Sequence, residues 1–352
     1  MLWLRNTIRA LGLLLFVGIV LVTPSRISDF RSSEFALIGI FFIAILGLNL
    51  LTGYTGVISL GHGAFMAIGA YVTGILMLGR PGLETAGLAP ADWLPIGDGM
   101  KDVYTIPIAA LVAALAGAAF GLPALRLSGP YLALATFGVA VATPIIVRKF
   151  DSVTGGSGGL SLFETENLTG AFTNAVHLPG RTVTFNDWLY YLTWSIALAL
   201  FVVAWAIHHS RLGRAFRAIR DNEIAAAASG VGLATHKTLA FTLSALYAGV
   251  AGSLLAISAF SVQPGAFPVD RSIALLVGLA IGGLGSLAPL LAGAAFLVFL
   301  PQLAQDISQA PGVPAVIYGG VLILVMFAMP GGLGGLLRRL SGSLTFKLYS
   351  RS

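Results

Sequence analysis

Long apolar runs follow one another along the whole chain and are separated by short polar stretches. A helix of about 20 apolar residues covers roughly 30 Å of hydrocarbon, so each run is long enough to cross a bilayer. A large soluble core would show shorter runs, interrupted by polar faces. The pattern therefore predicts an all-α, polytopic membrane protein with about ten transmembrane helices. They are expected near residues 10–23, 35–51, 63–79, 106–125, 130–147, 188–207, 238–260, 270–283, 287–303 and 314–330.

The composition supports this prediction. Hydrophobic residues make up 57% of the chain and charged residues only 10%, whereas soluble globular domains carry about 25% charged residues. Cysteine is absent, which excludes disulfides and thiolate chemistry in this chain.

Two segments allow a second interpretation. Residues 270–303 form either two antiparallel pieces around the glycines at 282, 283 and 285 or one long tilted helix. The first apolar run, near 10–23, could be a cleaved signal peptide, although no small-x-small cleavage site follows it.

The distribution of charge favours ten spans with both termini in the cytoplasm. Of 20 basic and 14 acidic residues, twelve bases and two acids then lie inside, which leaves eight bases and twelve acids outside. This is the bias that the positive-inside rule requires, and it explains the net charge of +6 without nucleic-acid binding. The inside bases are Arg5, Arg9, Arg126, Arg211, Arg214, Arg217, Arg220, Lys237, Arg338, Arg339, Lys347 and Arg351.

The chain is expected to form a single transmembrane domain, 1–352, with two long external loops, 80–105 and 148–187. The glycine-rich stretch 151–160 lies in the second loop. It is either a flexible linker or a surface for an external partner.

Glycines interrupt the apolar pattern at two places, around 53–63 and around 282–285. Non-helical backbone is tolerated at membrane depth only where it is buried in protein or lines a cavity. Paired breaks therefore indicate a transport path. The alternative is close helix packing through small residues.

The sequence lacks the residues that ion coupling, voltage sensing, metal binding, catalysis and ATP binding would require. No Asp, Glu, Lys or Arg stands in the middle of a span, which disfavours an ion-coupled carrier or a voltage sensor. His62 lies within a break and either relays protons or, more simply, forms a local hydrogen bond. A single histidine gives no metal or catalytic site, so neither is expected. None of the four lysines follows a glycine, so no phosphate-binding loop is present and a separate chain would have to bind ATP.

The cytoplasmic loop 208–237 contains a pattern of its own. Arginines at 214, 217 and 220 share a helix face in neighbouring pairs. Asp221 is expected to cap a following helix of about two turns, which Glu223 and the alanines favour and Gly230 ends. The loop either only sets topology or forms a docking knob for a cytoplasmic partner.

Four blocks, in order, resemble the permease subunits of branched-chain amino-acid ABC importers of the LivM type. They cover most of the chain: residues 47–65, residues 125–138 with Thr154-Gly155-Gly156, the cytoplasmic loop with residues 239–252, and residues 282–288. Three positions differ from the usual pattern: Gly158, Ala288-Pro289 without an intervening glycine, and Met329-Pro330-Gly331 without an arginine.

The resemblance implies that the loop is a coupling helix seated in an ATPase subunit. The residues expected to couple to that subunit are Arg217, Arg220, Asp221, Asn222, Glu223, Ile224, Ala225, Ala226 and Gly230. It also implies two ATPase subunits, a second permease subunit and an external substrate-binding protein, with no cofactor bound by this chain itself.

We expect a non-enzymatic permease of the bacterial inner membrane that passes branched-chain amino acids or a related small solute. Backbone N–H groups at helix breaks could meet the carboxylate of a zwitterionic substrate. The expected pathway residues are Thr55, Gly56, Ser59, Gly61, His62, Tyr131 and Thr136. Alternatives are a permease for urea, short amides or other small organic acids, a stand-alone carrier or channel, and a membrane enzyme or scaffold.

Overall fold

The computed structural model describes residue 23 and residues 28–88, 97–124, 127, 129–163, 177–178, 181–182, 184–310, 312–328 and 332–335. The predicted first span, 10–23, lies outside the described residues except for its last position. In the described part, eight helices are long and apolar enough to cross a membrane. The predicted all-α, polytopic membrane class is confirmed.

The long helices agree with the predicted spans within a few residues at most ends. They are α2 (Asp29–Leu48), α3 (His62–Thr85), α4 (Asp102–Ala124), α5 (Pro130–Lys149), α7 (Phe185–His209), α10 (Leu233–Ala259), α11 (Val269–Gly282), α12 (Leu290–Ile307) and the shorter apolar α13 (Val313–Ala328). The largest differences are at the start of α2, the end of α3 and the start of α10. Residues 270–303 form two helices, because α11 ends at Gly282. The two are antiparallel: a Cβ atom on Gly282 would meet Leu290, and one on Gly293 would meet Gly278.

Short elements connect the long ones. The π-helical turn η2 (Asn49–Gly53) continues α2, and α8 (Arg211–Asp221) and α9 (Glu223–Ala228) form the loop between α7 and α10. At the opposite end of the bundle lie α6 (Asp151–Thr154) and the 3-10 turn η3 (Pro264–Ala266). That end also carries two small antiparallel ladders, β1 (Leu160–Ser161) with β4 (Ser261–Val262) and β2 (His177–Leu178) with β3 (Arg181–Thr182).

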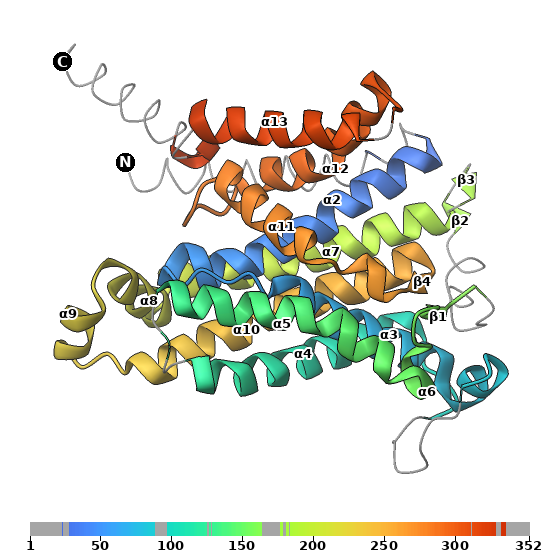
Figure 1. The fold of residues 1–352 in the computed structure, drawn as a ribbon, viewed down its shortest axis with the longest axis horizontal. Coiled ribbons are helices and arrows are strands. Elements are labelled where there is room, and N and C mark those ends of the chain that lie inside the picture. The colour runs from blue at the N-terminus through green and yellow to red at the C-terminus, as the bar shows by residue number, and fades with distance from the viewer. Residues whose placement is uncertain are drawn as a thin grey trace.

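Figure 1 shows α8 and α9 at one end of the bundle and the four strands with α6 at the other. The predicted cytoplasmic loop and the second predicted external loop therefore lie at opposite ends. This arrangement agrees with the alternation on which the topology prediction depends.

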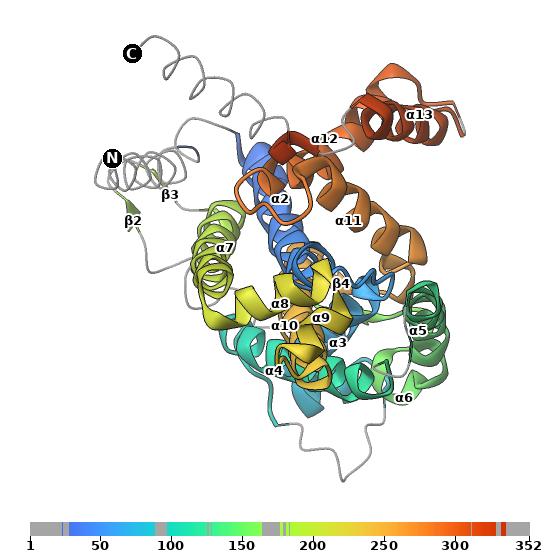
Figure 2. The same ribbon diagram turned by 90° about the vertical axis from the view of Figure 1, so that its left-hand side faces the viewer.

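Helix α10 forms the centre of the bundle and packs against α2, α3 and α4. Seen from the end that carries α8 and α9, these helices surround α10, whereas α5 and α13 lie at the periphery (Figure 2). Small residues allow the closest approaches: a Cβ on Gly69 of α3 would overlap the Gly249 carbonyl, and one on Gly252 of α10 would overlap the Met66 carbonyl. Close backbone contact through glycine is a common way to pack helices inside a membrane.

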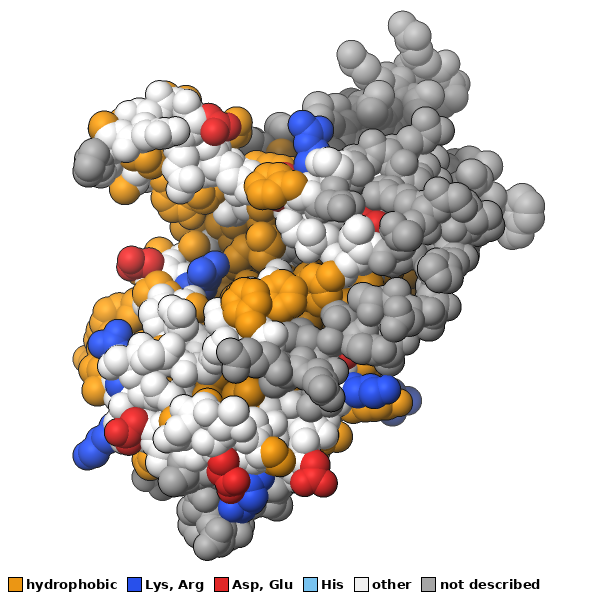
Figure 3. Space-filling view, turned by 90° about the vertical axis from the view of Figure 1, so that its right-hand side faces the viewer, with side chains coloured by type: hydrophobic (Ala, Val, Ile, Leu, Met, Phe, Trp, Pro, Cys, Tyr) orange, Lys and Arg blue, Asp and Glu red, His pale blue; other side chains and the backbone are white. Residues whose placement is uncertain are grey.

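The peripheral helices expose apolar side chains. Leu134 and Ile145 of α5 and Val316 and Phe327 of α13 are exposed, as expected of surfaces that face lipid or another subunit. Figure 3, which views the end with the strands, shows apolar side chains gathered in a hollow of this face.

Candidate functional site

The first glycine-rich break contains a non-helical segment, residues 56–61, that turns one face toward the protein interior. After η2, whose five residues are all buried, the chain turns at Gly56, where φ is +75°, and α3 begins at His62. Exposure alternates between these points: Gly56 and Ile58 are exposed, whereas Val57 and Ser59 are buried. The segment therefore behaves like a strand with one face toward the core.

Hydrogen bonds place the end of this segment deep in the bundle. The Leu60 N–H donates to Thr136 Oγ1 of α5 (3.0 Å), and the Gly63 N–H donates to Ser272 Oγ of α11 (2.9 Å). His62 Nδ1 lies 3.4 Å from the hydroxyl of Ser244, near the middle of α10. Helix α3 thus begins inside the protein, and side-chain hydroxyls satisfy backbone donors that a continuous helix would have satisfied itself.

Asn49 joins the first break to the second. Its side chain is fully buried; Oδ1 accepts from the Gly285 N–H (2.9 Å), and Nδ2 donates to the Ser286 carbonyl (2.8 Å). Gly53 lies in the same contact, because a Cβ there would overlap Asn49 Oδ1 and approach the Gly285 nitrogen. The two breaks, more than 200 residues apart in the sequence, are therefore one structural unit.

Replacing Asn49 with alanine is expected to destabilise this unit. The substitution removes two part-buried hydrogen bonds, each worth about 0.5–1.5 kcal/mol, and leaves the Gly285 N–H and the Ser286 carbonyl without these partners. We expect a loss of roughly 1–3 kcal/mol in unfolding free energy, measurable by chemical denaturation of the purified protein in detergent. Thr143→Ala in α5 removes only a hydroxyl bonded within its own helix and should change stability far less. Equal losses in the two variants would contradict the assigned role of Asn49.

The predicted pathway residues divide by exposure. Thr55, Ser59, Gly61, His62 and Thr136 are buried, whereas Gly56 and Tyr131 are exposed, Tyr131 by 69%. Thr55 donates to the Leu51 carbonyl within the first break, and Thr136 binds the Leu60 N–H. The structure thus brings six of the seven residues together around the break and places Tyr131 at the periphery, near the start of α5.

His62 forms a local contact in the described conformation. Its Nδ1 faces the Ser244 hydroxyl, and its Nε2 has no hydrogen-bond partner among the described residues. In the part of the chain that the structure covers, no three His, Cys, Asp or Glu side chains group as metal ligands do.

The predicted coupling loop folds into two helices, of which α9 lies at nearly the position predicted for the short helix. The structure corrects one detail: α9 is capped by Asn222 and not by Asp221. Asn222 adopts an extended conformation, and its Oδ1 accepts from the Ala225 N–H (3.0 Å), whereas Asp221 still belongs to α8. The helix ends before Gly230, whose φ is +83°.

Helix α8 packs on the bundle, whereas α9 projects from it (Figure 1). Phe216 and Ile219 of α8 are buried, but Ile224 of α9 is 83% exposed. A short ion pair, Lys237 Nζ to Glu223 Oε2 (2.7 Å), fixes the start of α9 to α10. The result is a small, braced projection with an apolar side chain on its surface, and we call residues 222–230 the foot.

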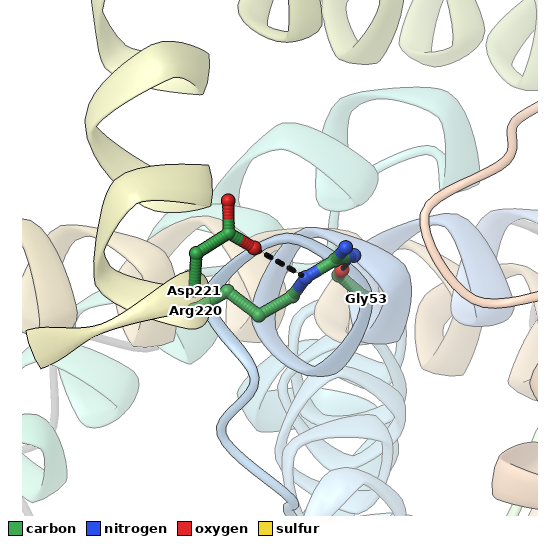
Figure 4. Close-up of polar contacts among 3 residues, drawn as sticks. All are labelled: Gly53, Arg220 and Asp221. Carbon is green, nitrogen blue, oxygen red and sulfur yellow. Dashed lines mark hydrogen bonds and ion pairs between the residues drawn. The ribbon is translucent and has the colours of Figure 1, made fainter.

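The two arginines of the predicted coupling set point toward the bundle. Arg217 Nη1 contacts the Nδ1 and the carbonyl oxygen of His208, both at 3.0 Å, at the end of α7. Arg220 Nη1 donates to the Gly53 carbonyl (2.8 Å), and its Nε lies 3.7 Å from the Asp221 carboxylate (Figure 4). Arg220 therefore links the loop to the first break.

Sequence reasoning did not single out Asn49, Ser244, Ser272 or Lys237. An amide inside an apolar run is the one signal that could have pointed to Asn49, because a buried polar side chain requires partners. The other three residues become informative only when their partners on distant helices are known.

Comparison with known proteins identifies the family. A family model described as "Branched-chain amino acid transport system / permease component" matches residues 32–328. The high-affinity branched-chain amino acid transport system permease protein LivM of Escherichia coli K12 is 32% identical over 308 residues, covering 84% of this chain and 67% of the relative. LivM of Salmonella typhimurium matches to the same extent, and LivH of that organism is 26% identical over 86% of this chain and 92% of the relative. No solved structure matches.

Proposed function

The chain belongs to the family of branched-chain amino-acid transport permeases, and from that premise we propose that it is the membrane subunit of an ATP-driven importer in the bacterial inner membrane. The projecting foot supports the proposal most directly. It is a folded, exposed helix on the end predicted to be cytoplasmic, and the sequence contains no phosphate-binding loop of its own. ATP would be bound by two partner ATPase subunits.

We propose that the remaining partners are a second permease subunit and an external substrate-binding protein. The whole chain, 1–352, would act as one permease domain, with loops 80–105 and 148–187 facing the binding protein. The names of the LivM and LivH relatives support branched-chain amino acids as the solute. Urea, short amides or other small organic acids are the alternative solutes.

The first break is the proposed contact with the solute. Its outer face, at Gly56 and Ile58, is exposed, and the segment leads to the start of α3, where the Leu60 and Gly63 N–H groups already donate to Thr136 and Ser272. Helix starts carry partial positive charge, which suits the carboxylate of an amino acid. Ser59, His62 and Thr136 would hold this backbone in place from behind and would not line an open channel, because their side chains are buried.

Reconstitution tests the function. Proteoliposomes that contain this chain, the second permease subunit and the ATPase subunits are expected to accumulate radiolabelled leucine only with ATP and the binding protein present. Uptake by this chain alone, without an ATPase, would identify a stand-alone carrier. Competition by unlabelled valine but not by urea would support the amino-acid assignment, and the reverse result would support the alternative.

A further inference from the structure

The side chain of Arg220 lies where the coupling loop meets both glycine-rich breaks. Its Nη1 donates to the Gly53 carbonyl at the end of η2 (2.8 Å). A Cβ on Gly285, in the second break, would lie 3.1 Å from the same nitrogen. A Cβ on Gly56, in the first break, would lie 2.9 Å from Arg220 Cγ.

The acceptor is a carbonyl that the end of the helix leaves free. The last carbonyls of a helix have no partner within it and are satisfied by side chains, water or ligands. At Gly53, the arginine of another element supplies that partner. Figure 4 shows the guanidinium between the Gly53 carbonyl and the Asp221 carboxylate, which lies 3.7 Å from Nε.

The two glycines beside Arg220 leave room for it. Gly56 and Gly285 both have φ of +75°, a conformation that side chains other than glycine rarely adopt. Both also approach the arginine so closely that a methyl group would press against it. Asn49 ties the second break to the first through Gly285 and Ser286, so one guanidinium contacts a connected pair of breaks.

Arg220 is also next to the foot. It lies in the last turn of α8, two residues before Asn222, the cap of α9. Displacement of the foot by a bound partner would therefore move the guanidinium, and with it the Gly53 carbonyl.

We infer that Arg220 is the positioning residue that transmits movement of the foot to the two breaks, and so couples ATP hydrolysis to opening of the solute path. The inference rests on the proposed function and extends it from docking to transmission. The docking surface, with Ile224, and the transmitting contact, at Arg220, are then separable.

The test compares solute transport with ATP hydrolysis in the assembled transporter. The Arg220→Gln variant is expected to co-purify with the ATPase subunits and to hydrolyse ATP. The amount of solute moved per ATP should fall at least about fivefold, because a charged hydrogen bond is lost. Arg220→Lys keeps one charged donor and should restore part of the ratio. Arg214→Gln is the matched control: Arg214 is exposed on the same helix, and its side chain makes no hydrogen bond or ion pair among the described residues, so its ratio should equal that of the wild type.

A labelling experiment reports the movement itself. The chain has no cysteine, so Ile58→Cys places a single thiol on the exposed face of the first break. In the wild-type background its rate of modification by a maleimide, read as the mass shift of this chain, should differ between nucleotide-free and vanadate-trapped complexes. In the Arg220→Gln background that difference should be largely lost.

Two results would overturn the inference. One is an unchanged ratio and an unchanged labelling difference in Arg220→Gln; the other is a proportional fall of transport and hydrolysis together with loss of the ATPase subunits. Failure of the proposed function is recognised separately, because the wild-type chain would then show no ATP-dependent uptake.

Discussion

Ile224→Asp should release the ATPase subunits from the permease. Ile224 is the most prominent apolar side chain of the foot, 83% exposed, and the few hot-spot residues at the centre of an interface each cost about 2–4 kcal/mol of binding when they are lost. Burying an unpaired carboxylate at this position adds a desolvation cost. We expect roughly 30-fold to 1000-fold weaker association, seen as loss of co-purifying ATPase in mild detergent and loss of ATP-driven uptake.

Ile307→Asp provides the matched control. Ile307 is also an exposed isoleucine, 70% accessible, but it ends α12 at the start of the connection to α13 and lies outside the foot. This variant should co-purify with the ATPase as the wild type does. Normal association of Ile224→Asp, or equal loss in both variants, would show that the foot is not the docking site. Deleting residues 221–230, a larger change to the chain, should likewise abolish co-purification of the ATPase.

The second large effect is expected at Gly252, where α10 and α3 meet. A Cβ at Gly252 would overlap the carbonyl oxygen, carbonyl carbon and Cα of Met66, so even alanine forces the two backbones apart. Overpacking of a core commonly costs about 1–3 kcal/mol. Because the obstacle here is backbone that cannot rotate away, we expect Gly252→Ala to lose about 3 kcal/mol or more, measured as the free energy of unfolding in detergent.

Gly138→Ala shows whether the effect is specific to the contact. Gly138 is also a helical glycine, in α5, but no atom lies within 4 Å of a Cβ placed there. Alanine favours helix over glycine by up to about 1 kcal/mol, so this variant should be as stable as the wild type or slightly more stable. A tolerated Gly252→Ala, or a damaging Gly138→Ala, would be incompatible with the packing described above.

Local features of the fold could be predicted from the sequence because they depend on nearby residues. Hydropathy located the spans, since a bilayer sets their length. The break between α11 and α12 followed from Gly282 and Gly283, and the short foot helix followed from Glu223 and the alanine run. The predicted cap was one residue early because Asp221 and Asn222 are both good caps, and only the backbone conformation distinguishes them.

Contacts between distant segments could not be predicted in this way. Hydropathy does not show that Asn49 meets Gly285, that Arg220 reaches Gly53, or that Lys237 braces Glu223. Helix ends also extend beyond the apolar runs. Helix α10 begins at Leu233, before the predicted 238, because Lys237 is paired with Glu223 and can lie within the helix. For the same reason the sequence did not show that five of the seven predicted pathway residues are buried.

The bracing of the foot has a consequence for how fast a partner can be captured. A six-residue helix on its own is marginal in water, because nucleation is unfavourable. Here the Asn222 cap and the Lys237–Glu223 pair hold it in shape before anything binds. The conformational entropy of the foot has therefore already been lost when the permease folds. A partner can bind the foot as a rigid body, without a coupled folding step.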